Sequence, residues 1–542
     1  MLGLMQNQPL LISGLIEFAA LNHGDGEIVS RRVEGDVHRS NYRTAADRSR
    51  QVANALDRID LAFGDRVGTL AWNGYRHFEL YFGVSGSGRV LHTVNPRLSP
   101  DQVVWILNHA EDRVLCFDMT FLPIVKAIWK HCPTVKHWIV MGDADALPAD
   151  SGVQGLLSYE AWIGAESSQY AWPTFDENTA STLCYTSGTT GNPKGALYSH
   201  RSTVLHAFAG ALPDSLNMSA RDSVLPVVPM FHVNAWGLPY VGAMTGAKMV
   251  FPGAALDGKS VYELIEAEGV TMAAGVPTVW LGLLGHLAQN KLRFSTLNRT
   301  VIGGSACPPT MIKTFDADYG VTVLHAWGMT EMSPLGTVCN LKLKQQNLPT
   351  DQRLAVLAKQ GRAVFGVDMK IVDPDGKTLP WDGHTTGDLL VRGPWVVSSY
   401  FKGEGGDPLV DGWFPTGDVA AIDADGFLQI TDRSKDVIKS GGEWISSIDI
   451  ENIAVAHPAV AMAACIAIAH PKWDERPRRV VMKKPGADVT REALLAFYEG
   501  KVAKWQVPDD VAFVDAIPLG ATGKMQKMKL REQFKAYRFA GT

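Results

Sequence analysis

Apolar and polar positions alternate along the first two thirds of the chain so that helices and short strands are predicted in turn. In the range 43–63 the apolar positions Val52, Leu56 and Ile59 recur at helical spacing, which predicts an amphipathic helix. Ser99–Pro100 supplies an N-cap and a first-turn proline for a second helix. Two more helices are predicted over 261–268 and 277–289, and strands over 66–72, 113–117, 136–141, 270–274, 299–302 and 321–325. Strands separated by helices predict parallel sheets covered on both faces, in more than one unit.

The pattern changes after Gly361, where short antiparallel strands joined by turns are predicted at 367–373, 387–392 and 427–431. A charged segment at 432–436 follows them. We expect the domain boundary there, with a large N-terminal domain at 1–432 and a small C-terminal domain at 433–542. The expected fold class is α/β, with parallel α/β subdomains and a small β-barrel-like subdomain in the large domain. The small domain is expected to be α+β and to end in a Lys- and Arg-rich helix.

The composition narrows the classes of protein that fit the chain. Hydrophobic residues are 46% of the 542 positions and charged residues 20%, so a large core is available and disorder is not expected. The 51 Lys and Arg residues nearly balance the 56 Asp and Glu residues, which argues against a nucleic-acid partner. The six cysteines form no CxxC pair, so neither a zinc cluster nor a redox motif is predicted. Scattered thiols favour a reducing, cytoplasmic location.

Two apolar segments need a separate explanation. The N-terminal segment has no basic region and no cleavage site of small residues, so we interpret it as mature sequence. The range 223–247 contains no Asp, Glu, Lys or Arg, and about 20 apolar residues can span a membrane. Because Pro226, Pro229 and Pro239 interrupt this range, we expect a buried core segment there and no transmembrane segment.

The strongest chemical signal is the segment 185–195, with the sequence YTSGTTGNPKG, which follows the short apolar run 182–184. Its glycines let the backbone turn tightly and present N–H groups, while the hydroxyls and Lys194 add donors. Such a loop suits a polyphosphate. It is not a Walker A loop, because no Gly-Lys-Ser/Thr stands at the required spacing. A flexible linker is the alternative, but a linker predicts neither a preceding strand nor the Pro193–Lys194 pair.

Three further segments carry candidate chemistry in the large domain. The segment 229–237 places His232 among aromatic residues, either as a hydrogen-bonded core residue or as a group facing a carboxylate at the mouth of an apolar pocket, with Trp236 deeper inside. The segments 303–306 and 325–331 combine small residues, a tryptophan that offers a stacking face, and a glutamate suited to Mg²⁺. Each of the last two could also be ordinary turn structure.

The remaining candidates lie near and beyond the charged segment. The Thr-Gly-Asp sequence at 416–418 places a carboxylate where ribose hydroxyls could bind, although surface turns often contain such an aspartate. The range 432–444 joins a cationic cluster to a glycine pair and could equally be a solvated linker. Lys524 lies on a Gly-bounded loop near the C-terminus, where it could project into a distant site or belong to a solvated tail.

In this order and spacing the segments resemble the adenylate-forming superfamily of acyl- and aryl-CoA synthetases, luciferases and non-ribosomal peptide synthetase adenylation domains. The resemblance runs from about residue 10 to about residue 535. The segment SGGEWISSIDIE and residues 91–98 are most similar to the branch of fatty-acid and medium-chain acyl-CoA ligases and 3-methylmercaptopropionyl-CoA ligases. The resemblance implies an ATP-dependent carboxylate–CoA ligase that uses Mg²⁺, passes through acyl-AMP and releases AMP and pyrophosphate.

The resemblance also implies a substrate class and an assembly. The acid is expected to be a short- to medium-chain fatty acid or 3-methylmercaptopropionate; the alternatives are a long-chain acid or another acyl acceptor. A homodimer is expected. The large domain is expected to hold ATP and the acyl group, and the mobile small domain to carry the catalytic lysine. A non-catalytic nucleotide sensor is disfavoured, because Lys524, Glu331 and Asp418 are all present.

The resemblance assigns roles to residues by position. The expected catalytic residues are Lys524, His232, Thr186 and Glu331, of which Thr186 and Glu331 are also the expected Mg²⁺ ligands. The expected ATP and AMP contacts are Thr186, Ser187, Gly188, Thr189, Thr190, Gly191, Lys194, Gly304, Ser305, Ala306, His325, Ala326, Trp327, Gly328, Met329, Thr330, Asp418, Arg433 and Lys524. The expected acyl contacts are His232, Val233, Trp236 and Gly304. The expected CoA contacts are Lys435, Lys439, Gly441, Gly442, Glu443, Trp444 and Glu475.

The two half-reactions are expected to need two positions of the small domain. Lys524 would bridge the substrate carboxylate and the α-phosphate in the first step. The domain would then swing about Lys435, the first hinge candidate, or Asp432, the second, and bring the CoA contacts to the site. Trp327 stands where many relatives carry Tyr, and Trp236 stands at an expected pocket gate or floor.

Overall fold

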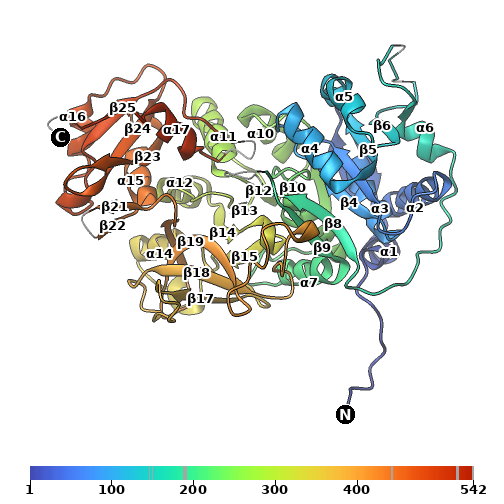
Figure 1. Ribbon diagram of the computed structural model, residues 1–542, viewed down its shortest axis with the longest axis horizontal. Coiled ribbons are helices and arrows are strands. Elements are labelled where there is room, and N and C mark those ends of the chain that lie inside the picture. The colour runs from blue at the N-terminus through green and yellow to red at the C-terminus, as the bar shows by residue number, and fades with distance from the viewer. Residues whose placement is uncertain (146, 149, 187–191, 441–442, 521–523, 540–542) are drawn as a thin grey trace.

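The computed structural model describes residues 1–145, 147–148, 150–186, 192–440, 443–520 and 524–539, and these form four β-sheets. In Figure 1 the strands up to β20 lie in a large body, and the elements from β21 onward form a smaller unit on the left. The fold class predicted from the sequence is confirmed, since parallel α/β units precede an antiparallel sheet and a small α+β unit. Among the described residues, no helix combines the length and the hydropathy needed to cross a bilayer.

The first sheet has seven strands, all parallel except the edge strand β9. In spatial order they are β7 (Leu156–Ser158), β6 (His137–Met141), β5 (Asp112–Asp118), β3 (Arg66–Leu70), β4 (Val90–Thr93), β8 (Ala180–Tyr185) and β9 (Gly195–Ser199). The helices of this unit are α2 (Tyr42–Arg58), α3 (Tyr75–Gly86), α4 (Pro100–Ala110), α5 (Leu122–Ile128) and α6 (Tyr159–Gly164). The Ser99 cap of α4 is confirmed as a capping box with Gln102. The helix predicted to reach Phe63 ends at Arg58, because Asp60 adopts a left-handed conformation with φ 56°.

The second sheet has nine strands and runs beside the first. In spatial order they are β16 (Arg362–Ala363), β15 (Leu335–Val338), β14 (Thr322–Gly328), β13 (Arg299–Ile302), β12 (Met272–Gly275), β10 (Ser223–Pro226), β11 (Lys248–Phe251), β1 (Glu27–Arg31) and β2 (Val37–Asn41). The strands from β14 to β1 are parallel, and β2, β15 and β16 join antiparallel. The other helices of the large body are α1 (Ile12–Asn22), α7 (His200–Ala211), α8 (Val233–Trp236), α9 (Leu238–Thr245), α10 (Gly258–Ala267), α11 (Pro277–Asn290), α12 (Pro309–Tyr319), α13 (Leu343–Gln346) and α14 (Thr350–Leu357).

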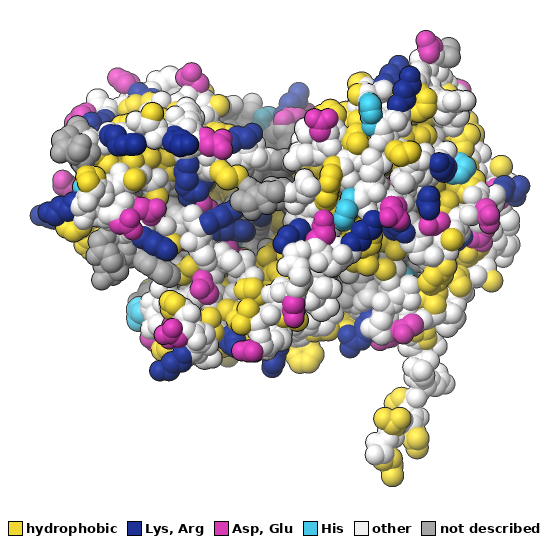
Figure 2. All heavy atoms as spheres, viewed as in Figure 1, with side chains coloured by type: hydrophobic (Ala, Val, Ile, Leu, Met, Phe, Trp, Pro, Cys, Tyr) yellow, Lys and Arg dark blue, Asp and Glu magenta, His cyan; other side chains and the backbone are white. Residues whose placement is uncertain are grey.

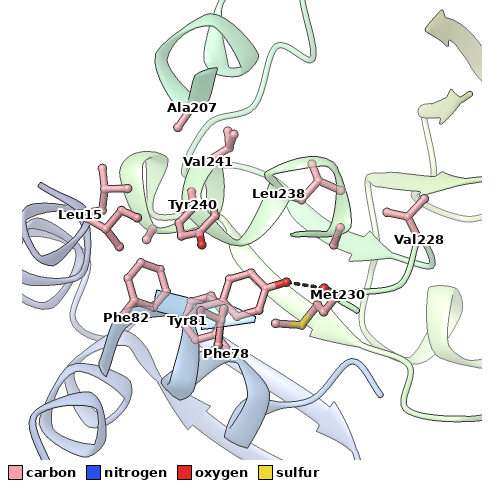
Figure 3. Packing of buried hydrophobic residues seen from close by; sticks show 14 of the residues in the cluster. Leu15, Phe78, Tyr81, Phe82, Ala207, Val228, Met230, Leu238, Tyr240 and Val241 are labelled. Carbon is pink, nitrogen blue, oxygen red and sulfur yellow. Dashed lines mark hydrogen bonds between the residues drawn. The ribbon is translucent and has the colours of Figure 1, made fainter. Parts of the chain in front are cut away.

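Buried apolar residues cover both faces of the second sheet. On one face, α10, α11 and α12 pack through a cluster that includes Trp280 and Phe315. On the other face, α3 of the first unit packs against α9, and Figure 3 shows Phe78, Tyr81 and Tyr240 meeting between them. The uncharged range 223–247 forms β10, α8 and α9 and is largely buried, as expected. The two parallel units therefore share one core.

The antiparallel strands predicted after Gly361 form a four-stranded sheet of β17 (Asp368–Val372), β18 (Gly387–Arg392), β19 (Phe414–Ile422) and β20 (Leu428–Arg433). The small C-terminal unit has its own core. It consists of β21 (Ile438–Ser440), β22 (Glu443–Ile445), α15 (Ser447–Val455), β23 (Val460–His470), β24 (Asp474–Lys483), α16 (Arg491–Ala496), β25 (Asp510–Phe513) and α17 (Lys527–Gln533). The Lys- and Arg-rich last helix is confirmed as α17.

Candidate functional site

A cavity of about 240 Å³ opens at the carboxyl ends of the parallel strands β10, β12, β13 and β14, which is where open α/β sheets bind ligands. Thirteen of the residues predicted from the sequence line it: Thr186, His232, Val233, Trp236, Gly304, Ala326, Trp327, Gly328, Met329, Thr330, Glu331, Arg433 and Lys524. Gly303, from the predicted small-residue segment 303–306, also lines it, and six lining residues were not predicted: Leu216, Leu238, Ala274, Val301, Pro334 and Leu335. The tertiary structure thus brings together segments that lie more than 300 positions apart in the sequence.

Lys524 reaches this cavity from the small C-terminal unit. Its backbone pairs with the segment before it, since Gly520 N donates to Lys524 O at 2.6 Å and Gln526 N donates to Pro518 O at 2.8 Å. A Cβ atom on Gly304 would lie 3.8 Å from Lys524 Cε, so the lysine passes directly over this glycine. Figure 2 shows the surface hollowed between the small unit on the left and the large body on the right, with Lys and Arg side chains at its edge.

The charges around Lys524 set the protonation of two groups in the cavity. Burial and the Arg433 charge lower the pKa of Lys524 to about 8, although Asp418 and Glu331 act in the opposite direction. Burial and the Lys524 charge lower the pKa of His232 to about 3. At neutral pH the site therefore holds a neutral imidazole beside a mostly protonated lysine.

The lowered pKa of Lys524 predicts an alkaline limit on activity. In the adenylation reaction that the sequence resemblance implies, the neutral amine present above about pH 8 would no longer offset negative charge on the reactants, so kcat/KM should fall with a single ionisation near that pH. This limit can be measured by the exchange of pyrophosphate into ATP that depends on the carboxylic acid substrate, from about pH 6 to about pH 10. In Arg433→Gln the limit should move to higher pH, because one of the charges that lower the lysine pKa is gone. An unchanged limit in this variant would point to another group.

Trp327 is fixed in place by a carboxylate and a glycine. Its Nε1 donates to Asp418 Oδ2 at 2.9 Å, and Arg433 Nε lies 3.0 Å from Asp418 Oδ1. A Cβ atom on Gly336 would lie 2.7 Å from the indole ring, so only glycine lets the ring pack there. The indole N–H therefore orients the same aspartate that the sequence suggested for ribose binding.

Thr186 and Glu331 are two lining residues of the cavity that offer hard oxygen ligands. Thr186 closes the base of the loop, since its N–H donates to Lys194 O at 2.9 Å and its hydroxyl accepts from Lys194 N at 3.1 Å. Glu331 accepts a hydrogen bond from the Tyr400 hydroxyl at 2.8 Å. Among the described residues no cluster of three or more His, Cys, Asp or Glu could hold a metal by itself. A hydroxyl and one carboxylate fit Mg²⁺, which usually takes few protein ligands and completes its shell with phosphates and water.

Two side chains of the first unit hold the loop that follows β10. Asn73 Nδ2 donates to the carbonyl oxygens of Pro226 and Val228, both at 2.8 Å. Asn73 Oδ1 accepts from Met230 N at 2.6 Å, and the Tyr81 hydroxyl donates to Met230 O at 2.5 Å (Figure 3). The backbone that leads to the histidine is therefore fixed before any ligand binds.

The α8 turn that follows is left-handed, with φ between 46° and 58° at all four residues of Val233–Trp236. A left-handed turn costs roughly 1–2 kcal/mol per residue, so the surrounding packing must hold it. Cys184 Sγ donates to Asn234 Oδ1 at 3.2 Å, and Gly237 continues the positive φ. The turn directs Val233 and Trp236 to the cavity and buries the residues between them.

Some of the expected site residues lie elsewhere. His325 does not line the cavity: its Nε2 accepts from Cys307 N at 3.2 Å and its Nδ1 pairs with Ala358 O at 3.0 Å, so both ring nitrogens are used in bracing the strand ends. Ser305, Ala306 and Lys194 are close in sequence to lining residues without lining the cavity themselves. The expected contacts Ser187, Gly188, Thr189, Thr190, Gly191, Gly441 and Gly442 lie outside the described residues.

The expected CoA contacts Lys435, Lys439 and Glu475 do not line the cavity either. Glu475 Oε2 accepts from Lys439 N at 2.8 Å, and Glu443 and Trp444 belong to the neighbouring strand β22. These residues gather on the small unit while Lys524 occupies the cavity. In this arrangement Lys524, and none of these three residues, lines the cavity.

The chain matches the family model for the AMP-binding enzyme over residues 16–401 and the model for the AMP-binding enzyme C-terminal domain over residues 449–524. The chain belongs to the AMP-binding enzyme family. The resemblance to adenylate-forming enzymes is thereby confirmed.

Individual members of the family match over nearly the whole chain. The 3-methylmercaptopropionyl-CoA ligase of Ruegeria lacuscaerulensis is 57% identical over 537 residues, which cover 99% of each protein. The medium-chain-fatty-acid–CoA ligase of Ectopseudomonas oleovorans is 51% identical over 534 residues, which cover 98% of each. The crystal structure of the anthranilate CoA ligase AuaEII in complex with anthranoyl-AMP matches with a TM-score of 0.85 at 26% identity, covering 98% of this chain and 99% of that one.

No sequence signal marks several of the residues that shape the site. Asn73 and Tyr81 act through backbone atoms about 150 positions away, and no motif marks them. Tyr400 lies in a connection whose sequence suggests only a loop. Leu216 follows α7 without any pattern that points to a cavity.

Proposed function

We propose that this protein is an AMP-forming acyl-CoA synthetase: it joins a carboxylic acid to ATP as acyl-AMP and then transfers the acyl group to CoA. The observation that carries this proposal is the position of Lys524, which extends from the small unit into a cavity lined by His232, Trp327 and Glu331. A lysine in that place supplies a positive charge where two anionic reactants would meet.

In the first step a carboxylate oxygen attacks the α-phosphate and pyrophosphate leaves. Lys524, protonated below about pH 8, reduces the repulsion between the carboxylate and the phosphate. Trp327 offers a stacking face for adenine, and Asp418 retains acceptor capacity for ribose hydroxyls. Neutral His232 can orient the acid without adding charge. Mg²⁺, held by Thr186 and Glu331, would neutralise phosphate charge when bound.

In the second step the CoA thiol attacks the acyl carbonyl and AMP leaves. Lys435 lies between two anchored neighbours, which supports it as the hinge. Ser434 is held to the large body, where its N–H donates to Gly417 O at 3.0 Å. Asp436 is held to the small unit by Arg531, at 2.7 Å. Asp432, the second hinge candidate, is buried and accepts from Ser447 N at 2.6 Å, so it is less free to rotate.

A screen for AMP release tests the function directly. Purified protein with ATP, Mg²⁺ and CoA should release AMP and form the acyl-CoA with acids between acetate and palmitate, 3-methylmercaptopropionate or aryl acids. Omission of CoA should leave pyrophosphate exchange intact, because adenylation precedes thiol attack. Binding of ATP without AMP formation across the whole panel would contradict the proposal.

We place the substrate among short- to medium-chain acids, including 3-methylmercaptopropionate. Three expected acyl contacts, His232, Val233 and Trp236, line the cavity. Its apolar lining includes Leu216, Leu238 and Trp236. A thioether sulfur gains from contact with an aromatic ring such as Trp236, typically about 0.3–1.5 kcal/mol. The 3-methylmercaptopropionyl-CoA ligase and medium-chain ligase relatives support the same range.

Removing the Trp236 indole should shift the preference toward longer acids. The ring lies over Gly303, where a Cβ atom would be 3.3 Å from Cη2, and it limits the cavity on that side. Glycine accepts the φ of 58° at this position without strain. In Trp236→Gly we expect the ratio of kcat/KM for longer linear acids to kcat/KM for short acids to rise. The expected rise is roughly tenfold for each additional methylene group that the enlarged cavity can hold. The KM for ATP is the internal control, and an unchanged chain-length profile would contradict this role.

We further propose a cytoplasmic homodimer. All six cysteines are buried thiols, as expected in a reducing compartment. Large apolar side chains are exposed on two helices that touch each other, α1 and α7, and at the residue that follows α7: Phe18, Leu21, Phe208 and Leu212. Sedimentation equilibrium of the purified chain tests the assembly, and a mass of one chain at all concentrations would contradict it.

A further inference from the structure

Tyr400 connects two groups of the nucleotide end of the site that come from distant parts of the chain. It lies in the connection between β18 and β19, next to the 3₁₀ turn Phe401–Gly403. Its hydroxyl donates to Glu331 Oε1 at 2.8 Å. The Lys194 ammonium lies 4.8 Å from the centre of its ring, which is within the range of a cation–π contact. One side chain thus holds the expected Mg²⁺ ligand and the lysine of the phosphate loop.

The surroundings fix the Tyr400 ring in this position. Val397 N donates to Glu331 O at 2.8 Å, which ties the two segments together before the tyrosine is reached. A Cβ atom on Gly195 would lie 3.0 Å from Phe401 Cβ, so the glycine allows the turn after Tyr400 to approach the loop strand. The ring is therefore placed by backbone contacts on both sides.

The ammonium of Lys194 occupies a defined position. A Cβ atom on Gly405 would lie 2.5 Å from Lys194 Nζ, so this glycine leaves the space that the ammonium fills. Gly405 has a φ of +79°, which glycine adopts readily. Tyr400 on one side and Gly405 on the other thus define where the lysine sits before a nucleotide is present.

Glu331 has little other support for its side chain. It is nearly buried, and within the described parts of the chain Tyr400 is the only side chain that hydrogen-bonds its carboxylate. A neutral hydroxyl orients one oxygen and leaves the negative charge in place for a cation. Outer partners of this kind typically change metal affinity by about 10- to 100-fold when they are removed.

We propose that Tyr400 is a positioning residue for the metal–nucleotide end of the site. Its hydroxyl orients Glu331 so that the second carboxylate oxygen faces Mg²⁺, and its ring holds the Lys194 ammonium ready for the phosphates. This inference rests on the proposed function.

Two substitutions separate the two contacts. Tyr400→Phe keeps the ring and removes the hydroxyl, whereas Tyr400→Leu removes both. Mn²⁺ in place of Mg²⁺, with a non-hydrolysable ATP analogue, gives a spectroscopic signal by electron paramagnetic resonance. Tyr400→Phe should weaken Mn²⁺ binding by about 10- to 100-fold and leave the metal-free affinity for the analogue unchanged. Tyr400→Leu should show the same loss and, in addition, a metal-free affinity that is about threefold to tenfold weaker.

Control variants make the result specific. Tyr262→Phe removes a hydroxyl bonded to Arg293 O on the far surface of α10 and should leave Mn²⁺ binding unchanged. Lys194→Met removes the ammonium without altering Tyr400 and should weaken the metal-free affinity. This variant replaces Tyr400→Leu if Tyr400→Leu does not fold. Wild-type Mn²⁺ affinity in Tyr400→Phe, or an unchanged or tighter metal-free affinity in Tyr400→Leu, would overturn the proposal. If the wild-type protein still forms acyl-CoA in that case, the proposed function stands.

Discussion

Lys524→Ala is expected to lower adenylation by about 100- to 1,000-fold, the usual effect of removing one preorganised charge or donor from a reaction centre. The lysine lies over Gly304 and beside His232, where the carboxylate and α-phosphate would meet, so its loss leaves their repulsion unopposed. The second half-reaction should change by less than about threefold, since the small domain is expected to withdraw the lysine before the thiol arrives. Acid-dependent pyrophosphate exchange measures the first step, and acyl-CoA formation from supplied acyl-AMP measures the second.

A neighbouring lysine provides the matched control. Lys529 lies on the same small unit, on α17, and Lys529→Ala removes an equal charge without touching the cavity. It should leave both half-reactions near wild type. Equal losses of both half-reactions in Lys524→Ala would contradict the assigned role, because they would indicate a general defect of the site.

Lys435→Pro should give the reciprocal result, with thioester formation reduced by about 100-fold or more and adenylation nearly unchanged. Proline fixes φ and so blocks rotation at the one position between Ser434, held by Gly417, and Asp436, held by Arg531. The structure already has Lys524 in the cavity, so a blocked hinge keeps the arrangement for the first step. Single-turnover experiments separate formation of acyl-AMP from its conversion to acyl-CoA.

Lys435→Ala distinguishes the backbone from the side chain. This variant retains rotation about φ, and we expect at most a moderate rise in the KM for CoA. If it loses as much thioester formation as Lys435→Pro, the ammonium and not the hinge is responsible. Cross-linking the small domain in its present position should have the same effect as Lys435→Pro, with thioester formation lost and adenylation retained. Full thioester production after cross-linking would contradict the proposal that the domain takes two positions.

Much of the fold could be predicted because its signals are local. The capping box at Ser99, the apolar strand 299–302 and the turns between β17 and β18 are all encoded within a few residues. The helix that begins at Tyr42 was predicted about five residues too long, since the sequence continues to look helical while Asp60 turns left-handed. Hydrophobic periodicity therefore predicts the presence of a helix more reliably than it predicts the residue at which the helix ends.

The residues of the candidate site also fall into those that local motifs marked and those that only the tertiary structure brought to the site. Lys524, Glu331 and Trp327, which motif position singled out in the sequence, all line one cavity. His325 belongs to the same motif but does not line the cavity, because its two ring nitrogens are engaged by Cys307 N and Ala358 O. Leu216, Asn73 and Tyr400 were not foreseen, since each reaches the site across a contact that only the packing of distant segments creates.

The sequence by itself determined the alternation of strands and helices in the parallel units, the glycine-rich segment and the family, because short-range spacing and composition carry that information. Only the tertiary structure decided that the Trp327 indole donates to Asp418, that Tyr400 holds Glu331, and that the small unit lies with Lys524 in the cavity. These contacts join residues about 70 to 200 or more positions apart, and no local pattern can specify them. They form when separately encoded elements bury their apolar faces against one another, and the shared core then fixes which polar groups meet.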